Sequence, residues 1–507
     1  MKSTHPRLGW LSLILFLAGV VAVSRTHAHS ITLASGRTNT IVTPNTYLSR
    51  VVGDKVSPKK PQPTPDNRTP ESRKLENIRN ILRDIEYETN VKSAVIYVCF
   101  TQAKASSDSP SPPSVKPKDT EKPFQDKDIH EQCLQQAEEL KLGEGKQSLP
   151  AGKPGDNEQL QLLLISSTEQ LIYSSHEKVT QQNLQKAGRG FTDGVKNPEG
   201  RNEELYNQRN QLLYNLIVKP LETDLQRKGI KNLVFIVNRA IESIPFAALR
   251  DAQKNFLVER YSISLMPSFD FFNTPDSDIK TAGLLLMGAS TFADINHDPL
   301  PNVEHELHTI KDLWKGQSSQ PFLNETFTIS NLKSQHATGN FRIIHLATHA
   351  KVQSGNSRNS YIQFWGDEQL TLKQFEQLQL DEPPVDLLVL SACETSKGNN
   401  QAILGFAGAA LKVGVKSVLA SHWATNDLGT TALMAEFYQQ LNTAPIKAEA
   451  LRQAQLAMLR KQVRVEENKL ISSKQKVLLE LKSPLLETPD FSEPKYWAQF
   501  TLVGSPW

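Results

Sequence analysis

The sequence predicts an α/β protein: a mostly parallel β-sheet with helices on both faces, preceded by a small N-terminal α/β region. Short apolar segments such as 387–390 (LLVL) are typical of strands buried on both sides, as in parallel sheets. Stretches with helical periodicity alternate with these segments, which indicates parallel strands joined by right-handed crossovers. The 507 residues are enough for two or three domains with a substantial core.

The first 28 residues are typical of a signal peptide. Lys2 and Arg7 precede an apolar stretch at 8–23, and Ala28 is the kind of small residue that cleavage favours. Because this stretch is short for a membrane span, an uncleaved anchor is the weaker alternative. We expect an exported, periplasmic or extracellular protein with no membrane contact beyond such an anchor.

The N-terminal third is predicted to contain a linker and a small folded region. Residues 29–73 are rich in Thr, Pro and Lys and lack apolar periodicity, so we expect a disordered linker. The region 74–200 follows, and its two apolar strands should extend the main sheet; a regulatory or docking domain is the alternative. Its elements are a helix at 75–86, a strand at 93–100, a mobile Ser- and Pro-rich insertion at 101–128, a helix at 131–142 and a strand at 159–166.

The main domain is expected to span 201–507. A long helix at 203–228 should break near Pro220 and end at Gly229. Near the end of the chain, an apolar stripe that includes Leu451 and Met458 predicts a packed helix. The predicted strands lie at 233–237, 256–266, 283–287, 342–346, 387–390 and 417–420.

The charge balance argues against two classes of partner. The formal net charge of +3 includes Lys2, Arg7 and Arg25, with no acidic residue before Ala28, so cleavage leaves 3 − 3 = 0. A nearly neutral chain without a basic cluster beside aromatic residues gives no indication of nucleic-acid binding. The chain has no long run of a single charge sign, which argues against attachment to a membrane surface.

A phosphate-binding P-loop is excluded because no Lys-Ser/Thr follows glycine at the required spacing.

Two predicted strands end close to a reactive side chain. His349 follows the strand at 342–346, and Cys393 follows the strand at 387–390. Functional residues gather at the carboxyl ends of strands in open α/β sheets, so a thiol nucleophile with its base is the hypothesis. A buried, inert cysteine is the alternative, and His345 is interpreted as a core histidine. We expect no metal site, because His345 and His349 lack a nearby second cysteine or carboxylate pair.

The chain has three cysteines, which is an odd number for a protein predicted to be exported. If Cys99 and Cys133 pair in an oxidising compartment, Cys393 remains as a free thiol. Alternatively, all three are isolated and reduced. The sequence leaves this pairing open.

Six blocks in order resemble the CHAT domain, a branch of the caspase-like cysteine peptidases that includes relatives of separase. The resemblance covers about 205–507 and implies a caspase-like α/β/α sandwich. It also implies a cysteine endopeptidase that acts on protein or peptide substrates and needs no cofactor; the oligomeric state stays open. The blocks are 244–249 (IPFAAL), 300–307 (LPNVEHEL), 345–350 (HLATHA), 387–398 (LLVLSACETSKG), 405–427 (GFAGAALKVGVKSVLASHWATND) and 496–507 (YWAQFTLVGSPW).

By position in these blocks, the resemblance implies Cys393 as the nucleophile and His349 as the general base. The implied oxyanion hole consists of the backbone N–H groups of Ala350 and Cys393. The family commonly has Gly where this chain has Ala350, and Ala would be strained there only if its φ angle were positive. His422 replaces a usual Leu and is interpreted as a partly exposed loop residue.

Two acidic residues are further candidates for the site. Asp427 lies where relatives form the pocket for the residue before the scissile bond, and a carboxylate there would favour Arg or Lys. Equally, Asp427 can cap a helix that begins near Thr430. Glu394 follows the nucleophile and either orients loops or faces solvent.

Two other functions remain open from the sequence. One is a CHAT-fold scaffold or peptide-binding module that does not cleave its partner. The other is an esterase that uses Ser391, although the Gly-x-Ser-x-Gly elbow of such enzymes is missing.

Overall fold

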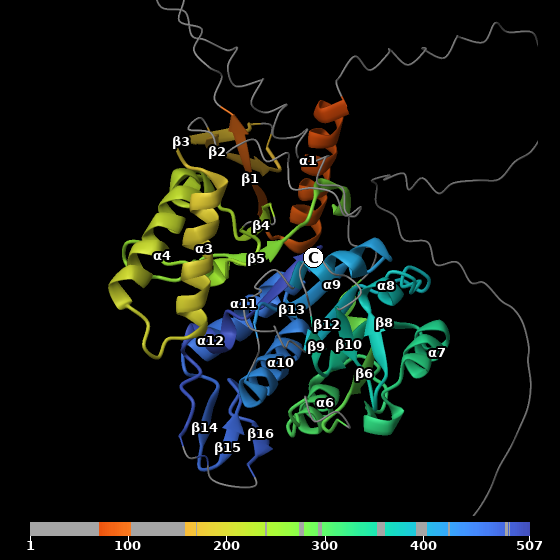
Figure 1. Ribbon diagram of the computed structural model, residues 1–507. Coiled ribbons are helices and arrows are strands. Elements are labelled where there is room, and N and C mark those ends of the chain that lie inside the picture. The colour runs from red at the N-terminus through yellow and green to blue at the C-terminus, as the bar shows by residue number, and fades with distance from the viewer. Residues whose placement is uncertain are drawn as a thin grey trace, which may run out of the picture. The chain divides into compact units, whose positions relative to one another are not determined.

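The computed structural model describes one large sheet of 11 strands with helices around it (Figure 1). The described residues are 70–102, 158–168, 170–238, 241–272, 278–292, 297–351, 360–391, 403–423, 426–481, 485 and 487–507. In chain order the strands of this sheet are β1 (Ser93–Gln102), β2 (Glu158–Ser166), β3 (Ile172–Glu177), β4 (Asn232–Ile236), β5 (Ser262–Leu265), β6 (Gly283–Gly288), β7 (Phe322–Leu323), β8 (Phe341–Ala347), β12 (Leu387–Ser391), β13 (Ser417–Ser421) and β17 (Phe500–Gly504).

The sheet consists of two parallel halves that run in opposite directions. In space its order is β3-β2-β1-β4-β5-β17-β13-β12-β8-β6-β7. Strands β1, β4, β5 and β17 pair in parallel, and so do β13, β12, β8, β6 and β7. The halves meet where β17 pairs antiparallel with β13, so their carboxyl ends lie at opposite edges of the sheet. The predicted mostly parallel α/β architecture is confirmed.

The N-terminal region extends this sheet. Strand β1 pairs in parallel with β4, with Ala94 opposite Leu233, and antiparallel with β2. The apolar strands predicted at 93–100 and 159–166 are therefore core strands. Residues 1–69, the helix predicted at 131–142 and the insertion beyond Gln102 lie outside the described residues.

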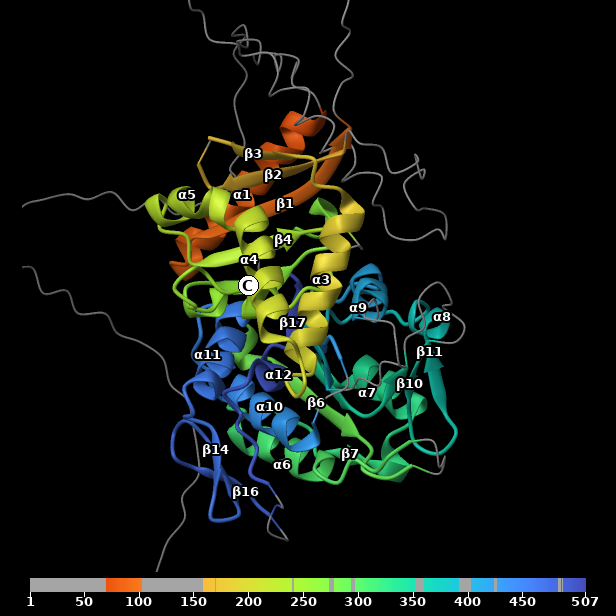
Figure 2. The same cartoon turned by 60° about the vertical axis from the view of Figure 1, so that its left-hand side comes forward.

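Helices flank the sheet. They are α1 (Pro70–Thr89), α3 (Gln181–Lys196), α4 (Glu203–Ile217), α5 (Glu222–Arg227), α6 (Val303–Leu313), α7 (Ile329–Gly339), α8 (Leu372–Phe375), α9 (Ile403–Lys412), α10 (Asp427–Leu441), α11 (Lys447–Leu459) and α12 (Pro494–Trp497). Helix α10 contacts α6, α11 and α12, and Figure 2 shows this group in front of the sheet beside α3 and α4. Within the described part of the chain, no helix has the length and apolar character that crossing a bilayer requires.

Several predicted element boundaries can be compared with the structure. The helix predicted at 203–228 breaks as expected: a 3₁₀ turn at Lys219–Leu221 contains Pro220, and Gly229 adopts a φ of +67°. Helix α1 begins at Pro70, so residues 70–73 are helical although they were assigned to the linker. Proline is well tolerated in the first turn of a helix, which permits this start.

The strand predicted at 256–266 is wrong in its first half. Residues Leu257–Glu259 form a 3₁₀ turn, and only Ser262–Leu265 is strand. The Glu259 carboxylate accepts the backbone N–H of Phe256 at 2.7 Å. This local side-chain hydrogen bond competes with the sheet for the backbone.

Two small antiparallel sheets complete the fold. The first directly follows β8 and contains β9 (Ala350–Lys351), β10 (Tyr361–Gln363) and β11 (Gln369–Thr371). The second contains β14 (Arg464–Glu466), β15 (Lys469–Ile471) and β16 (Val477–Glu480), none of which was predicted.

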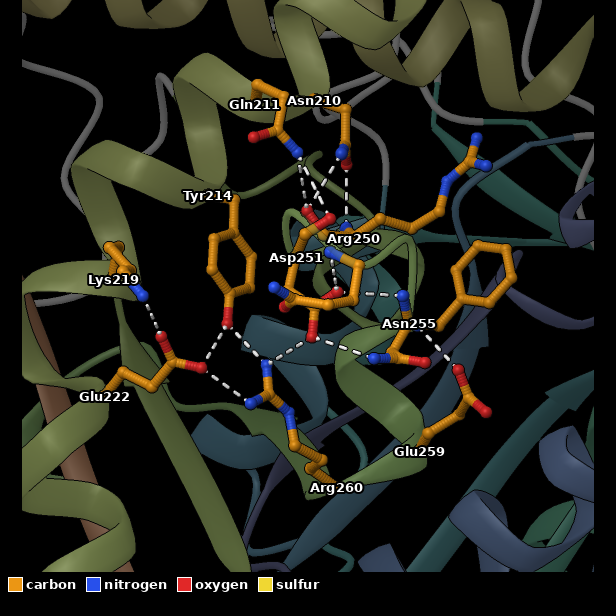
Figure 3. A network of polar contacts seen from close by, with 12 residues as sticks. Asn210, Gln211, Tyr214, Lys219, Glu222, Arg250, Asp251, Asn255, Glu259 and Arg260 are labelled. Atoms are coloured by element: carbon orange, nitrogen blue, oxygen red, sulfur yellow. Dashed lines mark hydrogen bonds and ion pairs between the residues drawn. The ribbon is translucent and has the colours of Figure 1, made fainter.

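A network of charged and polar side chains joins α4 and α5 to the segment that leads into β5 (Figure 3). Arg260 contacts Glu222 at 2.6 Å and Asp251 at 3.2 Å. The Asn210 side chain exchanges two hydrogen bonds with the backbone of Arg250, at 2.9 and 2.8 Å. These contacts fix the 250–260 segment against the helices.

Candidate active site

The ends of β8 and β12 lie side by side at one edge of the sheet. The two strands pair in parallel, and their last paired residues are Ala347 and Ser391. His349 comes two positions after Ala347, and Cys393 comes two positions after Ser391. Cys393 and Glu394 themselves lie outside the described residues. The register therefore brings together the two strand ends that lead to the predicted base and nucleophile.

The imidazole of His349 is held by the segment that precedes α6. Its Nε2 atom lies 2.7 Å from the carbonyl oxygen of Asp298, and because a carbonyl only accepts, Nε2 carries a proton. The ring centroids of Phe292 and His297 lie 4.7 and 5.2 Å from the centroid of the His349 ring. Because Nε2 carries the proton of the neutral His349 ring, Nδ1 is its basic nitrogen.

Ala350 is the first residue of β9 and lies opposite Ile362 of β10. The φ angle of Ala350 is not positive, so its methyl group causes none of the strain of a left-handed backbone. The N–H of Gln363 donates to the His349 carbonyl at 2.8 Å. Since hydrogen bonds alternate along an antiparallel pair, the N–H of Ala350 points away from β10.

Asp427 is the first residue of α10 and not its cap. The Asn426 side chain accepts the N–H of Gly429 at 2.9 Å, so the cap is Asn426 and the helix begins before Thr430. The Asp427 carboxylate accepts two hydrogen bonds from Asn302, from its N–H at 2.9 Å and its Nδ2 at 2.8 Å. Burial raises the pKa of Asp427 to about 6 against these hydrogen bonds, and the charge of Glu306 adds to the rise.

A buried polar cluster lies where α6 covers the two strand ends. Oε1 of Glu306 accepts a hydrogen bond from Ser391 Oγ at 2.7 Å and lies 3.0 Å from His345 Nε2. His345 is fully buried and contacts the Tyr438 hydroxyl, so its interpretation as a core histidine is confirmed. The Ser391 hydroxyl is buried against a carboxylate, which argues against an esterase based on this residue. Burial and the charge of Glu306 raise the pKa of Tyr438.

His422 differs from its interpretation as a partly exposed loop residue. The residue is only 2% exposed, and its backbone N–H donates to the Gln499 carbonyl just beyond the paired ends of β13 and β17. Its ring stacks on Trp423. Burial lowers the pKa of His422 to about 3, which keeps the ring neutral.

Sequence reasoning missed Asp298, His297 and the role of Glu306. Asp298 acts through its backbone carbonyl, which leaves no signature in the sequence. Glu306 belongs to the block 300–307, and that block was the one signal that could have drawn attention to it. Among the described residues, no group of three or more His, Cys, Asp or Glu side chains is arranged to hold a metal ion.

The chain has recognisable similarity to one family and to several solved structures. The family model described as CHAT domain matches residues 208–505. A comparison with curated proteins finds no match. Gingipain R, an Arg-specific cysteine proteinase, shares 10% identity with a TM-score of 0.36 over 64% of this chain and 76% of that chain. The complex of Porphyromonas gingivalis RgpB pro- and mature domains gives 11% identity and a TM-score of 0.36 over 65% and 77%.

The Saccharomyces cerevisiae separase–securin complex gives 10% identity and a TM-score of 0.39. That match covers 85% of this chain and 31% of the other, so this chain spans about a third of its length. The family match covers more than half of the 507 residues. This chain belongs to the CHAT domain family.

Proposed function

We propose that this protein is an exported cysteine endopeptidase that cleaves protein or peptide substrates with His349 as general base and Cys393 as nucleophile. The observation that carries the proposal is the position of His349. It follows the end of β8 beside β12, and its Nε2 is bound to the Asp298 carbonyl. Membership of the CHAT family supports the same chemistry.

In the proposed reaction, His349 Nδ1 takes the proton of the Cys393 thiol. The thiolate attacks the substrate carbonyl, and the resulting oxyanion accepts hydrogen bonds from the N–H groups of Ala350 and Cys393. The C–N bond then breaks, and the imidazolium gives its proton to the leaving amine. Water, deprotonated by the same imidazole, hydrolyses the thioester and releases the thiol. The Asp298 carbonyl keeps the ring in the required tautomer throughout.

The acidic residues have no assigned part in substrate selection. The Asp427 carboxylate already accepts two hydrogen bonds from Asn302, and a substrate Arg or Lys would have to compete with them. Glu394 lies outside the described residues. The proposal therefore specifies a peptide bond but no preferred side chain beside it.

The proposal requires a free Cys393 thiol, and the position of Cys99 supports this. Cys99 in β1 is disulfide-bonded, and its partner lies outside the described residues. Strands β1 and β12 are five strand spacings apart, or about 24 Å, whereas disulfide-bonded Cα atoms lie within about 7 Å. Cys393 follows β12 by two residues, about 7 Å of chain at most. We infer that Cys99 pairs with Cys133, and such a disulfide supports export.

The alternative of a non-cleaving scaffold receives less support from this site. Its sequence arguments were Ala350 in place of Gly and the difficulty of keeping a free thiol in an oxidising compartment. Because the φ of Ala350 is not positive, that substitution gives no reason to expect an inactive site.

The test measures the reactivity of Cys393 in the full chain. Alkylation by iodoacetamide is followed by mass spectrometry of the Cys393 peptide between about pH 5 and about pH 10. In the wild type we expect a thiolate pKa well below the free value of ~8.5, and in His349→Ala a return towards that value. Labelled casein serves as a general substrate, and its cleavage should stop in both His349→Ala and Cys393→Ala.

His336→Ala is the matched control. His336 is a histidine whose Nε2, like that of His349, contacts a backbone carbonyl, that of Pro383, at 2.9 Å, although His336 is buried and His349 is half-buried. It lies on α7, so its removal should leave the alkylation profile unchanged. Casein cleavage that persists in Cys393→Ala, or a thiol pKa indifferent to His349, would refute the proposed function.

A further inference from the structure

We propose that Glu306 is a positioning residue, which fixes the end of β8, and with it His349, against the end of β12. This inference rests on the proposed function, because its readout is the reactivity that His349 gives to Cys393. It concerns a residue on α6 for which the structure describes no contact with the His349 side chain.

The Glu306 carboxylate contacts both strands through one oxygen atom. Oε1 accepts a hydrogen bond from Ser391, the last residue of β12, and another from His345 of β8. Ser391 lies opposite Ala347, and His345 is two residues earlier on the same face of the sheet. The link therefore crosses between the strands four residues before His349.

The cluster around Glu306 has a complete set of hydrogen bonds. With His345 neutral, its Nε2–H donates to Glu306 and its Nδ1 accepts from the Tyr438 hydroxyl at 3.2 Å. Glu306 is 2% exposed and His345 is fully buried. A buried network whose polar atoms are all satisfied specifies one arrangement of the groups that it connects.

Helix α6 also holds His349 through the segment before it. The Asp298 carbonyl accepts the His349 Nε2–H, and Asn302, which immediately precedes α6, is bound by Asp427 of α10. One helix thus supports β8 twice, inside the sheet at His345 and beyond the strand end at His349. Loss of Glu306 removes the support inside the sheet, while the Asp298 contact beyond the strand end remains.

The electrostatics of the cluster point away from a purely stabilising role. Among the described residues, the basic side chain beside Glu306 is that of His345, which is neutral in this arrangement, and no Lys or Arg lies within ion-pair distance. A buried acid held mainly by neutral donors is unfavourable for stability. In some proteins, buried polar groups of this kind are retained because they specify one geometry.

The experiment compares wild type, Glu306→Ala and Glu306→Gln by the pH dependence of Cys393 alkylation with iodoacetamide, in the full chain. Both strand contacts end on Oε1, and the amide oxygen of Gln can occupy the same place. Glu306→Gln should therefore keep a profile close to wild type. In Glu306→Ala we expect the alkylation rate at neutral pH to fall roughly 10- to 100-fold, because the base is displaced from the thiol.

Glu436→Ala is the matched control for the loss of a buried acid. Glu436 on α10 is fully buried and accepts hydrogen bonds from Ser473 at 2.6 Å and Gln439 at 3.1 Å. Urea unfolding should show that both alanine variants are destabilised. Only Glu306→Ala should change the alkylation profile.

The outcomes separate this inference from the proposed function. A wild-type profile in Glu306→Ala, or equal impairment of Glu306→Gln and Glu306→Ala, overturns the positioning role. If Glu306→Ala does not fold, Ser391→Ala is tested instead, because it removes the hydrogen bond that links Glu306 to β12. An unchanged alkylation profile in Ser391→Ala also overturns the inference. A wild-type thiol that ignores His349 overturns the proposed function, and this inference with it.

Discussion

The two halves of the sheet each carry a cluster of polar groups around buried or half-buried acids, but the clusters are built differently. Beside β5, the carboxylates of Glu222 and Asp251 share the guanidinium of Arg260 (Figure 3). Beside β8 and β12, Glu306 meets His345 and the hydroxyl of Ser391. The first cluster balances its charges with a permanent cation, whereas the second surrounds an acid with donors that are neutral in the arrangement described above.

The pKa values of nearby carboxyls reflect this difference. Burial raises the pKa of Glu222, but hydrogen bonds from Lys219 and Arg260 outweigh it and hold the pKa below its usual range. Burial raises the pKa of Asp427 to about 6, and the charge of Glu306 acts in the same direction. One environment favours the charged form and the other opposes it. The proposals above accordingly assign the first cluster to stability and the second to the candidate active site.

The largest expected effect on stability is that of Arg260→Ala. The change leaves Glu222 and Asp251 without their shared cation, and we expect the free energy of unfolding to fall by about 3 kcal/mol. This lies at the low end for buried pairs because the Arg260 side chain is 28% exposed. Urea unfolding measures the loss, and Arg260→Lys, which keeps the charge without the planar fork, should lose less. A changed alkylation profile of Cys393 in either variant would contradict the division between the two clusters.

Asp427→Asn should have a smaller effect of opposite sign. The pKa of Asp427 is raised from its ordinary 3.8 to about 6, so the folded state binds the proton more tightly and is penalised once the carboxyl ionises. The penalty develops as the pH rises from about 4 to about 6 and persists above. At neutral pH we expect Asp427→Asn to unfold with about 1–2 kcal/mol more free energy than the wild type.

The expected gain in free energy is smaller than the full pKa difference would give, because Asn at position 427 accepts the Asn302 hydrogen bonds more weakly than a carboxylate does. Urea unfolding at several pH values should show the advantage shrinking as the pH falls through 6 towards 4. A variant less stable than the wild type at neutral pH would show that the Asn302 hydrogen bonds dominate. Asp278→Asn, at an exposed 3₁₀ turn, is the control and should show no comparable trend.

The smallest effect is expected from Ala350→Gly. Because Ala350 has no positive φ, glycine relieves no strain, and its extra freedom in the unfolded chain costs about 0.5–1 kcal/mol of stability. The alkylation rate of Cys393 and the cleavage of casein should stay close to those of the wild type. A large rise in either rate would show that the alanine restrains the oxyanion donor, and would assign this chain a weakened site.

The elements that sequence reasoning predicted best are those whose burial is simplest. Strands β8, β12 and β13 are largely apolar and almost fully buried, so their sequences show the pattern expected of strands covered on both faces. The first half of the strand predicted at 256–266 is also apolar, but the Glu259 carboxylate binds the backbone N–H of Phe256 and redirects the chain. Apolar character alone does not distinguish a strand from a buried 3₁₀ turn.

The candidate site was predictable only in part. His349 stands out because it follows an apolar strand, and it lies at that strand end in the structure. The group that orients it is a backbone carbonyl 51 residues away, and any residue type supplies such a group. Glu306 resembles an ordinary helical surface residue in the sequence, and its contact with Ser391 spans 85 residues. His422 was misjudged because its burial comes from tertiary packing, and its backbone N–H is bound to Gln499, far along the chain.

The place of β17 between β5 and β13 bears on how the protein is made in the cell. Both neighbours are translated by residue 421, but the strand that joins them consists of Phe500–Gly504. Until the ribosome has released that segment, two sheet edges at the centre of the fold lack their partner. Unpaired edges recruit strands from other chains, so the nascent protein is most prone to aggregate just before synthesis of β17. A chaperone that shields these edges during that interval would have the greatest influence on its yield.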